Sequence, residues 1–255
     1  MPGTKRSNGA QTVRRAMRAL KLIAAGPPEG SRLVDLSAEL ALERPTLHRL
    51  LRSLVAEGML TQHPGTRRYA LGSLLFELGL QAAHPFNLVP LCQPLLHRLA
   101  EETGDTSFLF VRSGNDAVCL ARVQGTYPIQ TPAVPVGSRQ PLGVNAGGLA
   151  LLSAVTRAEM EDIVEAVAPR LGTYGDLTPA QIREYWQRAQ ERGYALIGNR
   201  AVPGVTAAGL PVINEVGLPI AALTVAATNT RMTEERARRI LPYLRAATAE
   251  LASQL

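Results

Sequence analysis

The chain has 255 residues, 46% of them hydrophobic, and a formal net charge of +6. This length and composition suit one or two packed domains and exclude a disordered or low-complexity chain. No stretch approaches the roughly 18 to 20 uninterrupted apolar residues of a membrane span, and the N-terminus lacks a signal-peptide core, so we expect a cytoplasmic protein without membrane contact.

Positive charge is concentrated in the N-terminal part of the chain. Residues 1–72 carry twelve Lys or Arg against five Asp or Glu, whereas the remainder carries fifteen against sixteen. A domain that neutralises DNA phosphates should be basic, while a domain that binds a small ligand need not be. The distribution therefore favours DNA binding by the first domain and another role for the second.

The first predicted element is an amphipathic helix over residues 12–25. Its apolar side holds Val13, Met17, Leu20 and either Ile23 or Ala24. Its other side is strongly basic, with Arg14, Arg15, Arg18 and Lys21. A polar arm with Lys5 and Arg6 precedes this helix, and Gly26-Pro27-Pro28 ends it.

Two helical patterns come next, with only a short connection between them. Leu33, Leu36 and Leu40 predict a short helix, and a second helix starts near Arg44, with Pro45 suited to its first turn. The second helix has a buried stripe at spacing i, i+3, i+4 and i+7, formed by Leu47, Leu50, Leu51 and Leu54. Such a connection is typical of a helix-turn-helix, whose second helix enters the major groove of DNA.

A basic hairpin follows the second helix. Residues 59–63 and 68–71 flank a Pro64-Gly65-Thr66 turn, as the two strands of a wing would. The residues that we expect to contact DNA are Arg44, Thr46, His48, Arg49, Arg52, Arg67 and Arg68. The pattern does not separate base contacts from phosphate contacts. The alternative, an ordinary solvated amphipathic helix, stays open on periodicity alone, and the charge distribution favours DNA.

Another helix is predicted to begin with Leu71, Leu74, Leu75 and Leu78, before residues 84–87, His-Pro-Phe-Asn, break the pattern. We therefore divide the chain into a DNA-binding domain (residues 1–72), a linker helix and hinge (73–90) and a third domain (91–255). The linker helix is a rigid spacer, pairs with a second copy or packs on its own domain, and the sequence leaves these alternatives open.

The third domain alternates between helices and strands, which predicts an α+β fold. A helix with Leu91, Leu95 and Leu99 ends before Gly104, and a hairpin turns at residues 113–116 between strands at 107–111 and 117–123. Further helices are expected near residues 145–154, 157–167, 179–192 and 233–251. Further strands are expected near residues 194–197, 204–213 and 220–226.

No motif in the chain indicates catalysis, a metal site or a cofactor. The zinc-protease, phosphate-binding, nucleophile-elbow and dinucleotide patterns are absent from the sequence. Cys92 and Cys119 are expected to be buried structural side chains, and His97 an ordinary helix residue. We therefore expect a regulator and not an enzyme. A sensor that acts through protein contacts is the other class considered, and salt-dependent DNA binding separates the two.

Several segments match, in order and spacing, the pattern of a known family. They are residues 42–51, 68–72, 141–152, 193–195, 203–205 and 222–225. On these segments the chain resembles the IclR family of bacterial transcription regulators over nearly its whole length. The resemblance implies an N-terminal winged helix-turn-helix, a linker helix and a C-terminal GAF-like effector-binding domain.

The resemblance also implies where an effector binds. The family's pocket includes the loop that opens the helix at residues 146–153, which in this chain contains Asn145, Ala146 and Gly147. Free N–H groups at the start of a helix suit a carboxylate. The alternative is that the glycines only permit close helix packing.

Departures from the family pattern bear on the identity of the ligand. Ala207 stands where members that bind very small acids tend to have cysteine, and Leu149 replaces the usual lysine. Asn199, Arg200 and Thr224 remain as candidate polar contacts. We therefore expect an organic acid with a larger apolar or aromatic part as the small-molecule effector. We also expect a homodimer or a dimer of dimers on a double-stranded DNA operator.

Overall fold

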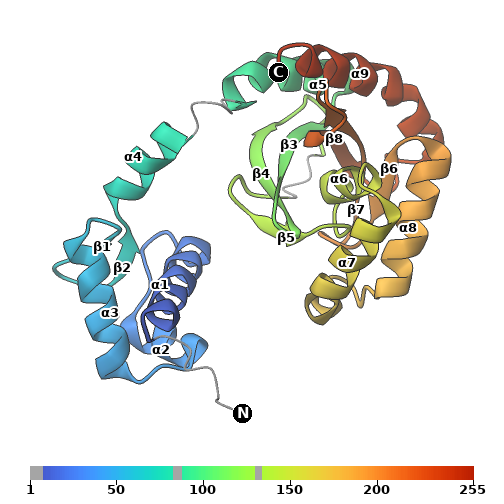
Figure 1. The fold of residues 1–255 in the computed structure, drawn as a ribbon. Helices are drawn as coiled ribbons and strands as arrows, with labels where there is room; N and C mark the ends of the chain where they lie inside the picture. The colour runs from blue at the N-terminus through green and yellow to red at the C-terminus, as the bar shows by residue number, and fades with distance from the viewer. Residues whose placement is uncertain (1–7, 83–87, 130–133) are drawn as a thin grey trace. The chain divides into compact units, whose positions relative to one another are not determined.

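The computed structural model describes residues 8–82, 88–129 and 134–255. The chain divides into two compact units, Met1–Asn87 and Leu88–Leu255 (Figure 1). The predicted polar arm with Lys5 and Arg6 and the predicted break at residues 84–87 lie outside the described residues. Within those ranges we find no helix that combines the length and the apolar character of a membrane span.

The N-terminal unit contains the predicted pair of helices and the hairpin. Its elements are α1 (Asn8–Ala25), α2 (Leu33–Leu40), α3 (Arg44–Ala56), β1 (Leu60–Gln62), β2 (Tyr69–Leu71) and α4 (Ser73–Ala82). The strands β1 and β2 are antiparallel, with Leu60 opposite Leu71, and Ser31 adds an isolated bridge to Tyr69. This arrangement confirms the winged helix-turn-helix that the sequence predicts.

A small apolar core holds these elements together. Leu36, Leu47, Leu51, Leu60 and Tyr69 are almost completely buried. Within the predicted stripe of α3, the residues at the other two positions are half-buried and pack at the edge of the same core.

The apolar side of α1 is only partly covered by this core. Leu20 and Ile23 are buried, whereas Val13 is 63% exposed and Met17 is 50% exposed. The apolar side of α1 is therefore buried only in its C-terminal half, which contributes Ala19, Leu20 and Ile23 to the core of the unit.

The C-terminal unit is built on a six-stranded antiparallel sheet in the order β5-β4-β3-β8-β7-β6. The strands are β3 (Thr106–Ser113), β4 (Asp116–Val123), β5 (Arg139–Pro141), β6 (Ala195–Gly198), β7 (Val205–Ile213) and β8 (Pro219–Thr228). The short strand β5 was not predicted, because three residues are too few for an alternating pattern.

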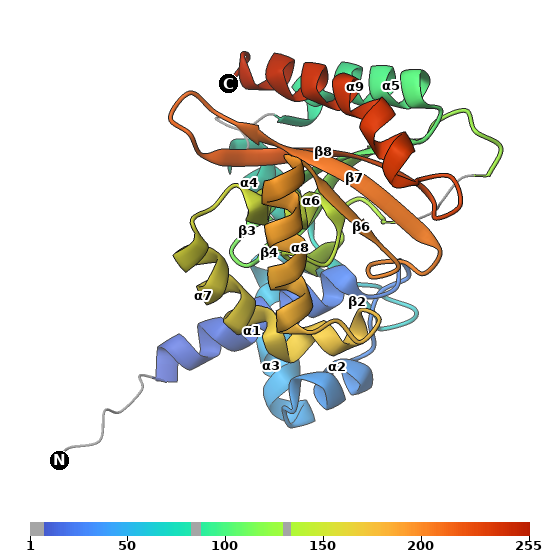
Figure 2. The same cartoon turned by 90° about the vertical axis from the view of Figure 1, so that its right-hand side faces the viewer.

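Helices cover both faces of this sheet (Figure 2). One face carries α5 (Leu88–Thr103) and α9 (Glu234–Ala252), and the other carries α6 (Ala146–Ser153), α7 (Arg157–Val167), the 3₁₀-helix η1 (Ala168–Thr173) and α8 (Pro179–Arg192). Two separate apolar cores result, one on each face. The unit is α+β, as predicted.

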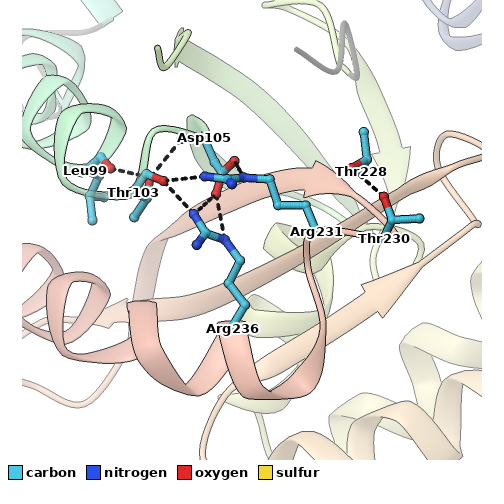
Figure 3. Close-up of polar contacts among 7 residues, drawn as sticks. All are labelled: Leu99, Thr103, Asp105, Thr228, Thr230, Arg231 and Arg236. Atoms are coloured by element: carbon cyan, nitrogen blue, oxygen red, sulfur yellow. Dashed lines mark hydrogen bonds and ion pairs between the residues drawn. The ribbon is translucent and has the colours of Figure 1, made fainter. Parts of the chain in front are cut away.

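A buried ion-pair cluster joins α5 to β3 and to the start of α9 (Figure 3). Asp105 is 2% exposed, and its carboxylate accepts hydrogen bonds from Arg231 and Arg236. Both guanidinium groups also donate to the carbonyl oxygen of Thr103, at the C-terminus of α5, where the helix dipole favours a cation. The cluster therefore ties the end of α5 to the start of α9 and to the loop before it.

Candidate nucleic-acid interface and ligand cavity

The turn between α2 and α3 is fixed from both sides by Ser37. The Ser37 carbonyl accepts from the N–H of Leu42 at 3.2 Å, and the Ser37 hydroxyl donates to the Leu42 carbonyl at 2.6 Å. Ala41 adopts a left-handed conformation with φ of +51°, which an alanine rarely adopts. The hydrogen bonds of this turn hold α3 at a defined angle to α2.

The outward face of α3 presents most of the predicted DNA contacts. Arg44, Arg49 and Arg52 are exposed, and Thr46 and His48 are half-buried. None of the three arginines forms an ion pair within the described part of the chain. These guanidinium groups are therefore available to a phosphate or a base edge.

The two predicted arginines of the wing differ in their surroundings. Arg67 is exposed beside the tip and has a φ of +57°. Arg68 is half-buried, and its Nη1 donates to the Gly30 carbonyl at 2.8 Å. At the tip itself, Nδ1 of His63 accepts from two backbone N–H groups, at 3.2 Å each. Arg67 is thus the freer cation, while part of the Arg68 guanidinium is used inside the unit.

A cavity of about 40 Å³ lies on the α6 side of the sheet. Its lining comes from α6, from the strands β3, β6, β7 and β8, and from the loops beside them: Phe108, Phe110, Val134, Val144, Asn145, Ala146, Ile197, Gly198, Arg200, Ala201, Val202, Val205, Ala207, Thr224 and Ala226. Four of the six predicted effector contacts are among these residues. Gly147 and Asn199 are not.

The side chain of Asn145 caps the N-terminus of α6. Its Oδ1 accepts from the N–H of Gly148 at 2.7 Å, and its Nδ2 donates to Gln140 at 2.6 Å. The N–H groups of Ala146 and Gly147 have no hydrogen-bond partner among the described residues. The first turn of α6 therefore keeps donors that the cap does not use.

Gly147 meets a strict packing requirement. A Cβ at this position would lie 2.3 Å from a ring carbon of Phe110, a distance that real side chains do not reach. Close packing of α6 against Phe110 therefore requires a glycine at this position, as the alternative interpretation of the sequence proposed. This requirement does not depend on whether the N–H group of Gly147 binds a ligand.

Thr224 is the most deeply buried polar side chain among the described residues that line the cavity. It lies on β8 between Phe108 of β3 and Gly209 of β7, and it is 1% exposed. Its methyl group packs against Gly209, where a Cβ would lie only 2.7 Å away. No hydrogen bond of its hydroxyl to a described residue is found, and the residue lines the cavity, so the hydroxyl is a candidate contact for a ligand.

Arg200 is the only charged residue among the described residues that line the cavity. Its Nε and Nη2 donate to the hydroxyl of Tyr185 on α8, at 3.2 Å and 3.0 Å, and its Nη1 donates to the Gly175 carbonyl. These bonds use three of the five guanidinium donors. The other two remain for an anion.

Asn199, the next residue along the chain, braces a loop. Its Oδ1 accepts from the N–H of Gly204 at 2.9 Å and from Nδ2 of Asn229 at 2.6 Å. Its φ of +59° is a conformation that asparagine tolerates better than most residues. The structure therefore places its amide in the connection between β6 and β7.

Two aromatic residues of the cavity were missed in the sequence. The rings of Phe108 and Phe110 are stacked with their centroids 6.0 Å apart. Both belong to β3, whose apolar run looked like an ordinary core strand. Their spacing of two residues on one strand was the available signal, because it places both rings on the same face of the sheet.

The cysteines are buried, as expected. Burial raises the pKa of the Cys92 thiol to about 12 and that of Cys119 to about 11, so both stay protonated at neutral pH. In the part of the chain that the structure describes, no cluster of three His, Cys, Asp or Glu side chains could hold a metal ion.

Comparison with known proteins identifies both units. Residues 12–64 match the IclR helix-turn-helix domain, and residues 80–253 match the domain described as bacterial transcriptional regulator IclR C-terminal. The HTH-type transcriptional regulator BhcR of Paracoccus denitrificans is 28% identical over 237 residues, which cover 92% of this chain and 83% of BhcR.

Solved structures of similar regulators agree with this assignment. A putative IclR regulator of Silicibacter sp. TM1040 has a TM-score of 0.82 and 25% identity over 95% of both chains. An IclR homologue of Microbacterium hydrocarbonoxydans, solved with 4-hydroxybenzoate, has a TM-score of 0.74 and 22% identity over 95% of this chain and 98% of its own. These relatives are transcription regulators and not enzymes. The chain therefore belongs to the IclR family of bacterial transcriptional regulators, with a helix-turn-helix DNA-binding domain and a C-terminal effector-binding domain.

Proposed function

We propose that this regulator binds a double-stranded operator through α3 and the wing, and that a small organic acid in the sheet cavity alters this binding. The protein acts as a homodimer or a dimer of dimers, whose recognition helices enter the major groove about one helical turn, or a multiple of it, apart. Its place of action is the cytoplasm, where bacterial DNA lies.

In this proposal the outward face of α3 makes the central DNA contacts. Arg49 and Arg52 contact bases or phosphates, supported by Arg44, Thr46 and His48 of the same helix. From the wing, Arg67 contacts the DNA backbone or minor groove. Arg68 has a smaller share, because its guanidinium also holds the Gly30 carbonyl. The unpaired state of the α3 arginines supports this assignment.

The effector part of the proposal rests on the hydroxyl of Thr224, for which the described residues offer no hydrogen-bond partner, in a mainly apolar cavity. Ala146, at the start of α6, and Arg200 also line the cavity. We assign the carboxylate to the unused N–H groups of Ala146 and Gly147 and to the remaining donors of Arg200. The rings of Phe108 and Phe110 and the alanine side chains suit an apolar or aromatic body. Asn145 contributes by holding the first turn of α6, and Asn199 by bracing the neighbouring loop.

The small size of the cavity implies that effector binding changes the surrounding structure. A volume of about 40 Å³ holds only about three waters, so an aromatic acid must move the surrounding side chains apart. A ligand that prefers the widened state shifts the population towards it, with a coupling to DNA binding of about 1–3 kcal/mol. The sign of this coupling decides whether the effector strengthens or releases DNA.

The experiment combines two titrations of the full chain. Fluorescence anisotropy follows binding to DNA from upstream of its own gene, against unrelated competitor DNA and over a range of salt concentrations. Calorimetry compares 4-hydroxybenzoate and other aromatic acids with very small hydrophilic acids. Competitor-resistant binding that weakens steeply with salt, together with preferential binding of aromatic acids, is expected. Binding of only the very small acids would overturn the ligand class, and binding indifferent to salt would overturn the DNA contacts.

A further inference from the structure

A groove of about 380 Å³ lies between α1 and the turn of the helix-turn-helix. One wall is the basic side of α1, with Gln11, Arg14, Arg15 and Arg18, and the other is formed by Leu40, Ala41 and Leu42. These residues come from one compact unit, and α1 packs on both α2 and α3. We call this feature the α1–turn groove.

The three arginines of the groove lack carboxylate partners. No ion pair within the described residues involves Arg14, Arg15 or Arg18, although Glu39 and Glu43 lie at the end of α2 and in the turn. Like charges four residues apart, such as Arg14 and Arg18, disfavour a helix. An anion in the groove would relieve this repulsion, and the donor geometry of guanidinium groups matches phosphate oxygens.

The groove is also continuous with the helix-turn-helix. Ala41 and Leu42, which form one of its walls, lead directly into the N-terminus of α3. That end of a recognition helix enters the major groove, so the sugar-phosphate backbone bordering the major groove passes beside the turn. An anionic polymer bound to α3 therefore has its own charges next to the α1 arginines.

We propose that the α1–turn groove is a second DNA contact, which binds backbone phosphates of one strand at the edge of the half-site. The inference rests on the proposed function, since it requires α3 to dock on DNA. Arg14, Arg15 and Arg18 bind the phosphates, and Gln11 donates a hydrogen bond to them. The contact carries no sequence information, because phosphates are the same at every base pair.

The test is a salt titration of the full chain on double-stranded DNA of unrelated sequence, which needs no knowledge of the operator. Each phosphate that the protein no longer neutralises makes the slope of log K against log salt shallower by about 0.9. The double variant Arg14→Gln and Arg18→Gln should therefore reduce the slope by about 2. Arg14→Lys with Arg18→Lys should keep the slope, because the charges remain.

Lys21→Gln is the matched control, since it removes the same charge from an exposed position of α1 outside the groove. An unchanged slope for the Gln double variant, or an equal loss per charge for Lys21→Gln, would overturn the groove as a phosphate site. If the Gln double variant and the Lys double variant both have a lower midpoint of thermal unfolding, the arginines contribute to folding and the groove is not a phosphate site. If the unaltered protein binds no duplex at all, the proposed function itself is overturned. This outcome is distinguishable from a failure of the groove proposal, in which the unaltered protein still binds DNA.

Discussion

The Oδ2 atom of Asp105 accepts two hydrogen bonds from the guanidinium of Arg236, one from Nη2 at 2.6 Å and one from Nε at 3.1 Å. Its Oδ1 atom accepts from Nε of Arg231 at 2.6 Å. The carboxylate is 2% exposed, whereas the two arginine side chains are 19% and 23% exposed. One buried charge thus orders two arginines that partly reach water.

We expect Asp105→Asn to lower the free energy of unfolding of the C-terminal unit by about 3 kcal/mol. Breaking a buried ion pair leaves charges without a counter-ion, and the partial exposure of the arginines limits the loss. Chemical denaturation measures the change. Glu184→Gln, which breaks only an exposed pair with Arg188, is the control and should have a small effect. Equal effects of the two variants would contradict the structural role of Asp105.

The buried cysteines predict a loss of stability at alkaline pH. In the unfolded chain both thiols ionise near the ordinary pKa of 9.0, whereas in the folded chain burial raises the pKa of Cys92 to about 12 and of Cys119 to about 11. Because the folded state keeps these protons, the two thiols contribute fully to the free energy of unfolding below pH 9. This contribution is lost as the pH rises through 11 and 12. Between pH 8 and 11, the free energy of unfolding of the unaltered protein should fall more steeply than that of the double variant Cys92→Ala with Cys119→Ala. Parallel curves would exclude this contribution.

Gly147→Ala should destabilise the C-terminal unit by about 1–3 kcal/mol and weaken effector binding. Its Cβ would overlap the ring of Phe110, which lines the cavity, so the ring or α6 must shift. Thermal unfolding and calorimetry measure the two effects. Gly172→Ala in η1 is the matched control, because nothing lies within 4 Å of its added Cβ and its φ is not positive. A stable variant with normal ligand binding would show that the contact relaxes without cost.

The elements of the fold could largely be predicted because their ends are encoded locally. Thr156 caps α7, and Thr178 forms a capping box at α8, which ends at Gly193 with a φ of +74°. The predicted ranges of α7 and α8 therefore coincide with the observed helices. Short or uncapped elements such as β5 lack such signals.

The cavity was harder to predict, because strand pairing brings distant residues together. Phe108 lies opposite Thr224 across the β3–β8 pair, although they are far apart in the chain. The family resemblance indicated the loop before α6 and Thr224 on β8, and residues of both line the cavity. It gave no indication of the aromatic rings or of the Tyr185 hydroxyl that holds Arg200. Which residue of a loop lines the cavity, as Arg200 does and Asn199 does not, depends on tertiary packing.

Thr224→Val should weaken binding of an aromatic acid by about 1 kcal/mol, or roughly fivefold in Kd, while leaving the fold intact. Valine keeps the shape of threonine, and the hydroxyl that it removes has no partner among the described residues, so folding loses no hydrogen bond. Calorimetry with 4-hydroxybenzoate measures the affinity and thermal unfolding the stability. Unchanged affinity in a folded variant would remove the hydroxyl from the ligand site.

Arg49→Ala should weaken operator binding by about 1–3 kcal/mol, because its exposed guanidinium lies in the middle of the outward face of α3. If Arg49 reads a base, the affinity of the variant for the operator falls more than its affinity for unrelated DNA. Selection of bound DNA fragments then shows a loss of base preference at one position of the operator. If it contacts phosphate, both affinities fall together and the salt slope drops by about 0.9. Ser53→Ala, on the same exposed face, is the control for folding of the helix. Binding equal to that of the unaltered protein would place Arg49 outside the interface.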